Sequence, residues 1–202
     1  MFKVCKGAFI FIFFAYVPLG MAKIHIEPYV GYSFTSIGTT NLSRGLLEKG
    51  DIDKKTQQVI AEFSKRQLYQ GISPGMRLGY SSIGLAVGVD LTWGYWKSLF
   101  AENWTSFRDR QTIISLLPGL FVSYKLPLLF RAYASLIPQA SVQLKTKEGD
   151  KSCKRSRGGK IGISYLSLPF LSVNFEYLPL YIGGSGCQFW SHTGTVSANF
   201  TF

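Results

Sequence analysis

Five charged residues lie in segments that otherwise hold apolar or small polar residues, which makes them the first candidates for chemistry. They are three acids and two arginines: Glu27, Asp90, Glu176, Arg77 and Arg131. In an extended strand each would point to the polar face of its segment. Lys160 has the same inward parity, but it begins the predicted strand at 159–168, so we expect it near the outer end and away from these five. If that face is enclosed, the charges must pair, because an unpaired buried charge is costly. Such a set fits either a selective polar pore or a salt-bridge network that closes the interior, and a narrow interior favours the network.

The histidines and serines do not form a catalytic arrangement in the sequence. His25 and His192 are predicted near opposite ends of the fold, and Ser191 merely adjoins His192. Nothing fixes a nucleophile beside a base. There is also no metal-ligand cluster and no glycine-rich phosphate loop before a predicted helix. We therefore expect no catalytic residues, no metal and no cofactor.

The elements that must position the five charges are strands with one apolar and one polar face. Residues 191–202 show this alternation most clearly, and the chain ends on Phe202. The same pattern predicts strands at 23–34, 71–81, 83–96, 111–124, 128–145, 159–168, 171–182 and 191–202. Within 128–145 we expect one unbroken alternation, with Ala140, Val142 and Leu144 on the apolar face that lacks Arg131.

Connection lengths and aromatic residues specify how these strands are arranged. Tight turns at 81–82, 125–127 and 169–170 alternate with long connections at 35–70, 97–110, 146–158 and 183–190. Aromatic residues cluster at both strand ends. Those near the long connections are Tyr32, Phe34, Trp93, Tyr95, Trp96, Tyr181 and Trp190, and those near the turns are Tyr80, Tyr124, Phe130, Phe170 and Phe202. These features predict an all-β fold, an eight-stranded antiparallel up-and-down transmembrane β-barrel with long extracellular loops.

The N-terminal segment has the organisation of an export signal. Lys3 and Lys6 precede a short apolar run at 7–17, and Gly20-Met21-Ala22 has small residues where cleavage would occur. The sequence therefore predicts a cleaved signal peptide over 1–22 and one barrel domain over 23–202. The formal net charge of the chain is +11, which indicates an anionic neighbour. No nucleic-acid-binding signature is present, so we expect lipid phosphate and no nucleic acid.

The opening KIHIEPYVGYSF and the closing TGTVSANFTF resemble the OmpA-like eight-stranded outer-membrane β-barrels of Gram-negative bacteria. The resemblance implies an outer-membrane protein, with Phe200 and Phe202 in the terminal signal that the barrel-assembly machinery reads. Because the interior of an eight-stranded barrel is narrow, we expect a structural or surface-interaction role, with the lumen closed by the charges. Two alternatives stay open: a narrow channel or carrier for small apolar molecules, as in OmpW-like barrels, and a lipid-modifying enzyme.

The connection at 146–158 would lie on the outer face of such a barrel, and it is basic. Its cations are Lys147, Lys151, Lys154, Arg155 and Arg157. Lys and Arg donate to phosphate, so the segment predicts contact with lipopolysaccharide, although a run of charges also suits a plain solvated surface. Cys153 lies in this connection and Cys187 in the next one on the same face. In an exported protein, this pair predicts a disulfide.

Overall fold

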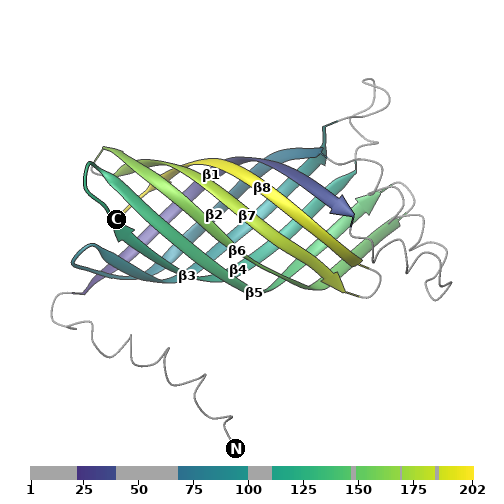
Figure 1. Cartoon of the computed structure of the whole chain (residues 1–202), viewed down its shortest axis with the longest axis horizontal. Helices are drawn as coiled ribbons and strands as arrows, with labels where there is room; N and C mark the ends of the chain where they lie inside the picture. The colour runs from purple at the N-terminus through teal and green to yellow at the C-terminus, as the bar shows by residue number, and fades with distance from the viewer. Residues whose placement is uncertain (1–21, 40–67, 100–110, 147–148, 169, 185–186) are drawn as a thin grey trace, which may run out of the picture.

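The computed structural model describes residues 22–39, 68–99, 111–146, 149–168, 170–184 and 187–202. Each strand pairs antiparallel with its sequence neighbour, and β1 pairs with β8, so the sheet closes into a barrel (Figure 1). The strands are β1 Lys23–Thr39, β2 Leu68–Ser82, β3 Leu85–Ser98, β4 Thr112–Lys125, β5 Phe130–Thr146, β6 Gly149–Leu168, β7 Leu171–Gly184 and β8 Cys187–Phe200. The predicted fold class is confirmed. No helix in the described ranges is long and apolar enough to cross a membrane.

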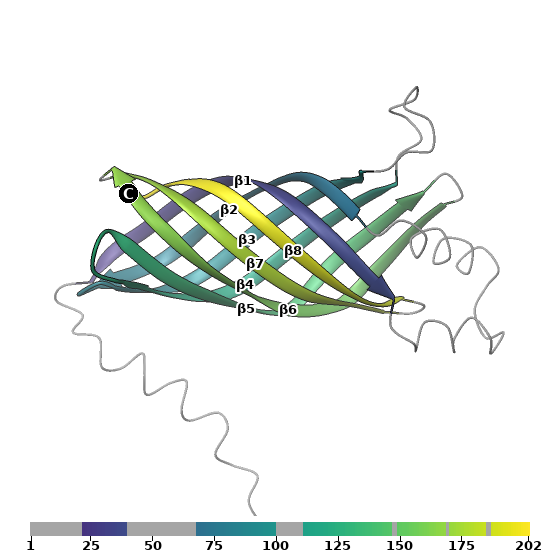
Figure 2. The ribbon, with the colours of Figure 1, turned by 45° about the horizontal axis from the view of Figure 1, so that its top comes forward.

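Figure 2 shows the strands running diagonally around one cylinder. We call the end with the connections at 83–84, 126–129 and 169–170 the turn end, and the opposite end the loop end. The predicted signal peptide, apart from Ala22, lies outside the described residues, as does Lys147. β1 and β2 reach Thr39 and Leu68, so residues 35–39 and 68–70 of the predicted connection are strand, and residues 40–67 lie outside the described residues.

Side chains alternate between an apolar outer surface and a polar lumen, as expected of a membrane barrel. On β3, Val89, Leu91 and Trp93 are 46–56 % exposed on the outside, whereas Asp90 and Thr92 are no more than 4 % exposed in the lumen. A broad exposed apolar surface is unfavourable in water, but it suits a lipid environment. The fold is thus a transmembrane barrel with an apolar outer surface and a polar interior.

Two of the three tight turns differ from the prediction. The first is formed by Ile83 and Gly84, with φ of 48° and 83°, and not by Ser81 and Ser82. A two-residue hairpin turn whose two central residues both have positive φ matches the twist of the paired strands, and Gly84 adopts it readily. In the second turn Leu128 and Leu129 also have positive φ, so β5 begins at Phe130.

The largest difference concerns the basic segment, which we predicted to be a loop. Most of it is strand: β6 starts at Gly149, and Lys145, Leu144 and Val142 of β5 pair with Asp150, Lys151 and Cys153 respectively. The alternation is hidden in the sequence because the register shifts near Cys153, so that Lys154 and Arg155 are both exposed. The basic residues therefore lie on a long β5–β6 hairpin.

The unbroken alternation predicted for β5 is also wrong. The β5–β6 register shifts between Ile137 and Ala140, where Pro138 and Gln139 are both exposed. We call this position the β5 bulge. An extra residue moves every later side chain to the opposite face. As a result Ala140, Val142 and Leu144, expected outside, are no more than 2 % exposed inside the barrel.

The bulge divides the lumen into two layers. Towards the turn end the interior is polar and charged, and we call this the charged layer. Towards the loop end it is the main hydrophobic cluster, which we call the apolar layer. Its residues are Ile37, Tyr69, Trp96, Ile113, Leu117, Ile137, Ala140, Val142, Leu144, Cys153, Leu178, Leu180, Ile182 and Phe189.

Trp96 is the exception among the aromatic residues predicted for the two outer bands. It is 2 % exposed and packs in the apolar layer, with its indole N–H donating to Ser73 Oγ at 3.2 Å. It follows outward-facing Tyr95 on a regular strand, so it must point inward. The remaining residues of the two predicted bands are exposed or half-buried on the outer surface.

Candidate functional site

The structure brings the five predicted charges together with a sixth. They come from six strands: Glu27 (β1), Arg77 (β2), Asp90 (β3), Arg131 (β5), Lys160 (β6) and Glu176 (β7). None is more than 8 % exposed. The strand pairing explains part of this grouping, because Glu27 lies opposite Arg77, and Arg77 opposite Asp90.

Arg77 is the centre of the charged layer. Its Nη1 donates to Glu27 Oε1 at 2.5 Å and its Nη2 to Glu176 Oε1 at 2.8 Å, while its Nε lies 3.7 Å from Asp90 Oδ2. The guanidinium lies between the rings of Tyr133 and Tyr29, 4.1 and 4.7 Å from their centroids. Arg77 thus contacts three carboxylates and two aromatic faces, as suits a planar cation with five donors.

Glu27 is the main hydrogen-bond acceptor on the turn-end side of the charged layer. Its Oε2 accepts a hydrogen bond from Arg131 Nη1 and lies 3.2 Å from His25 Nε2. Its Oε1 accepts from Asn199 Nδ2 at 2.5 Å as well as from Arg77. A carboxylate with several charge-assisted donors is well compensated for its complete burial.

Lys160 lies on the opposite side of the charged layer from Glu27. Its Nζ lies 2.8 Å from Asp90 Oδ2 and 3.7 Å from Glu176 Oε2. It also donates to Thr92 Oγ1 at 2.8 Å and to Tyr29 OH at 3.0 Å. Three acids therefore face three bases, and the layer is neutral as a set of ion pairs.

The predicted inward direction of Lys160 is confirmed, but its predicted depth is wrong. It was expected near the loop end, away from the other five, because the predicted strand began at 159, whereas β6 begins at Gly149. The five predicted charges carry three negative and two positive charges, and this imbalance was a usable signal for one more cation. The roles of Tyr29, Thr92 and Asn199 had no comparable signal.

The histidines and Ser191 occupy separate places. His192 is exposed on the outer face, where its Nδ1 lies 2.7 Å from Tyr177 OH and its ring stacks near Trp190. Ser191 is 1 % exposed in the lumen, so it points away from its neighbour His192. His25 lies in the charged layer. Within the described ranges no three His, Cys, Asp or Glu side chains gather as metal ligands.

The residues predicted to contact lipopolysaccharide are divided between the two faces of β6. Lys154, Arg155 and Arg157 are exposed, and the Arg157 guanidinium lies 6.0 Å from the centroid of the Tyr181 ring. Lys151 has the inward parity of Cys153 and is half-buried. Three of the five cations are therefore available on the outer surface.

Cys153 is fully buried, and its backbone lies against Gly184, where an added Cβ would be 3.2 Å from Cys153 Cα. Gly184 pairs with Cys187 across the β7–β8 hairpin. The side chain of Cys187 is outside those described, so the disulfide stays a prediction, now with adjacent backbones in its favour.

The predicted assembly residues lie at the turn end. Phe200 is the last residue of β8, and the Phe202 ring is 74 % exposed. The Phe202 N–H donates to Ile26 O at 2.9 Å, and Phe202 O accepts from Ile26 N–H at 3.3 Å. The chain end is thus fixed to β1 while its aromatic ring remains accessible.

Comparisons with solved structures agree with the fold. The chain is similar to Neisserial surface protein A, with 15 % identity over 90 % of this chain and 99 % of that one, at a TM-score of 0.51. It is also similar to Ail, the attachment invasion locus protein of Yersinia pestis, with 10 % identity over 88 % and 98 % of the chains, at a TM-score of 0.53. Ail in complex with the heparin analogue sucrose octasulfate matches at 12 % identity and a TM-score of 0.53, over 89 % and 99 %. No family model and no curated protein matches the sequence.

Proposed function

We propose that this protein is an integral outer-membrane barrel that acts through its outer surface and not through its lumen. The observation that carries this proposal is the occupied interior. Six paired charges fill the charged layer, and fully buried side chains such as Leu117, Leu180 and Phe189 fill the apolar layer. An eight-stranded barrel is only wide enough for its side chains, so neither layer leaves a continuous path.

Bilayer conductance tests this occlusion and separates it from the channel alternative. The protein purified from membranes and inserted in a planar bilayer should show no discrete conductance steps, and Glu176→Gln should not introduce them while Arg77 remains paired with Glu27. Steady steps in the wild-type protein, altered in size or ion selectivity by Glu176→Gln, would instead establish a pore lined by the charged layer.

We propose lipopolysaccharide as the surface partner, with the loop end facing outward. Arg157 borders an outer hollow of about 440 Å³ between Leu136, Pro138 and Trp190. Lys154 borders a second hollow, of about 310 Å³, between Leu116 and Pro118. A cation beside an apolar depression suits a lipid that carries a phosphate next to an acyl chain, because each part finds a matching contact.

The test is a triple replacement, Lys154→Ser, Arg155→Ser and Arg157→Ser. It should weaken lipopolysaccharide binding roughly tenfold or more, and the difference should grow at low ionic strength, where surface charges are least screened. A double replacement at the turn end, Lys23→Met and Lys125→Met, is the charge control and should not change the affinity. Sucrose octasulfate, which has no acyl chain, should compete poorly. Unchanged lipopolysaccharide affinity in the triple variant would leave the basic hairpin as a solvated surface.

We propose further that Phe200 and Phe202 serve as the terminal signal for the barrel-assembly machinery. The exposed ring of Phe202 supports this role. Deleting Phe202 should lower the amount of barrel in cell membranes and leave spontaneous refolding in liposomes nearly unchanged. An equal loss in both assays would show that Phe202 acts only in folding.

A further inference from the structure

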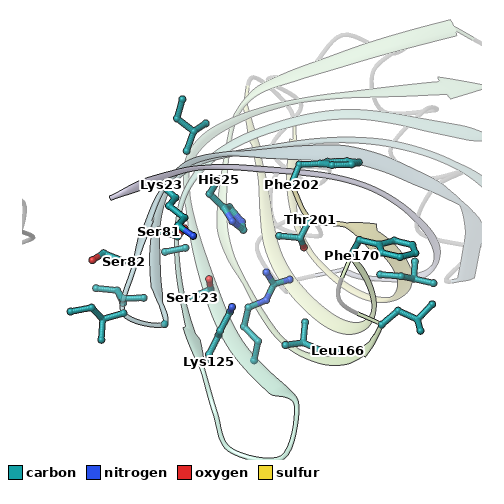
Figure 3. Close-up of a pocket in the computed structure, with 18 residues that line it drawn as sticks. Lys23, His25, Ser81, Ser82, Ser123, Lys125, Leu166, Phe170, Thr201 and Phe202 are labelled. Carbon is teal, nitrogen blue, oxygen red and sulfur yellow. The ribbon is translucent and has the colours of Figure 1, made fainter. Parts of the chain in front are cut away.

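The turn end of the barrel contains a cavity that none of the roles above uses. Its volume is about 360 Å³, within the size range of small-molecule sites. It is closed on the lumen side by the charged layer, through Arg131 and His25. Figure 3 shows side chains from the start of β1 and from the C-terminal residues around the same space, with Lys23 and His25 on one side and Thr201 and Phe202 on another.

The charge of this cavity is one-sided. Three permanent cations, Lys23, Lys125 and Arg131, line it together with His25, and no Asp or Glu is among the described residues of its lining. In Figure 3 the polar ends of Lys23, His25 and Lys125 point into the same space. Glu27 pairs with Arg131 from the lumen side, and it also pairs with Arg77. The described lining itself contains no acid, so no acidic side chain in the cavity balances the charges of Lys23 and Lys125.

A buried donor without a partner lies at the base of this cavity. Arg131 is 4 % exposed, and its Nε has no hydrogen-bond partner although both its Nη atoms have one. Ser82 also lines the cavity, but it has the outward parity of Tyr80, and its hydroxyl points away from the space that Lys23 and His25 enter (Figure 3). Buried donors normally find acceptors. A ligand oxygen beside the Arg131 guanidinium would satisfy this donor.

The rest of the wall limits the kind of ligand. Hydroxyls of Ser123 and Thr201 add two more donors beside the cations, and Leu166 and Phe170 form an apolar rim (Figure 3). The Phe202 backbone is engaged with Ile26, so the chain end is held at the wall of the cavity. Cations, hydroxyls and a small apolar rim are complementary to an oxyanion on a short carbon skeleton.

We propose that the turn-end cavity is a binding site for a small organic anion that carries a phosphate or carboxylate head group. Arg131 and the two rim lysines bind the head group, and Ser123 and Thr201 donate to its oxygens. The apolar rim contacts the carbon skeleton. The site opens on the side opposite the basic hairpin, so its ligand comes from the other compartment.

Backbone amide chemical shifts measure this binding in protein reconstituted in zwitterionic lipid nanodiscs. Inorganic phosphate and butyrate are titrated separately, against sodium chloride at equal ionic strength. We expect saturable shifts at Ser82, Ser123 and Thr201 with at least one probe. A response to phosphate alone assigns a phosphate ligand, a response to butyrate alone assigns a carboxylate, and a response to both shows that the oxyanion is recognised in either form.

Variants then test the site itself. The double replacement Lys23→Met and Lys125→Met removes two exposed rim charges and should weaken probe binding roughly five- to tenfold. Lys145→Met removes one charge at the loop end and should leave the affinity unchanged. The proposal is overturned if neither probe gives a saturable shift in the wild-type protein, or if the double variant binds as tightly as the wild type.

Discussion

Along β5, the two layers of the barrel have opposite arrangements of polar and apolar side chains. Before the β5 bulge, Ala134 and Leu136 face outward while Arg131 and Ser135 face the lumen. After it, Gln143 is exposed outside, and Val142 is fully buried inside. The first arrangement suits a lipid environment, and the second is that of a barrel in water.

This difference shows what one extra residue achieves. The sequence alternates polar and apolar residues along most of β5, and a strand without a bulge would carry that alternation unchanged from membrane into water. The bulge reverses which face of β5 carries the apolar residues, and it does so at the edge of the apolar outer band. The same alternation therefore serves both environments, with the polar face inside the membrane-embedded part and outside the exposed part.

The most damaging test adds one residue next to the bulge. Inserting a serine after Gln139 shifts the later part of β5 by one position and should turn Val142 and Leu144 outward, at a cost of roughly 1.5–3 kcal/mol for each lost burial. We expect almost no folded barrel in a cold gel-mobility assay after refolding. Deleting Gln139 removes the extra residue but leaves Val142 and Leu144 inward, so this control variant should still refold. Normal refolding of the insertion variant would show that the residue count at the bulge does not set the orientation of β5.

The next test concerns the charged layer alone. Arg77→Met removes contacts with three carboxylates and should lower the free energy of unfolding in liposomes by about 3–5 kcal/mol. Combining it with Glu176→Gln removes the strongest uncompensated acid, so the double variant should lose less than the sum of the two single losses. Strict additivity in urea unfolding would mean that the two groups are not coupled.

A paired substitution examines the apolar layer. Val142→Gln places an amide without a partner among buried apolar side chains and should cost about 2–3 kcal/mol. Its neighbour Gln143 faces outward, so Gln143→Val should change stability by no more than about 0.5 kcal/mol. The unbroken alternation expected from sequence requires the reverse order of effects.

The smallest effect is expected from the cysteines. If Cys153 and Cys187 are bridged, thiol labelling of the unfolded, unreduced mature protein should find no reactive thiol. Reduction should lower stability by about 2 kcal/mol, near the low end of the usual range, since the β6–β7–β8 sheet already holds the two backbones together. Two labelled thiols before reduction would exclude the bridge.

Sequence alternation was sufficient to predict the strands, their order and the inward direction of Glu27, Asp90 and Glu176. It was insufficient wherever the structure depends on a local irregularity or on long-range geometry. The bulges on β5 and β6 leave no distinct residue signature, so the basic segment was taken for a loop. Lys160 joins the charged layer because β6 begins at Gly149 and not at 159, so Lys160 lies well within the strand and not at its end.

The equality of three acids and three bases in the charged layer has an electrical consequence. A potential across a membrane acts on net charge with about 2.3 kcal/mol per elementary charge per 100 mV, and paired charges at similar depth experience no net force. The charged layer is therefore indifferent to voltage. A single neutralising replacement gives this layer a net charge, so the same potential that exerts no net force on the wild-type layer would act on that of such a variant.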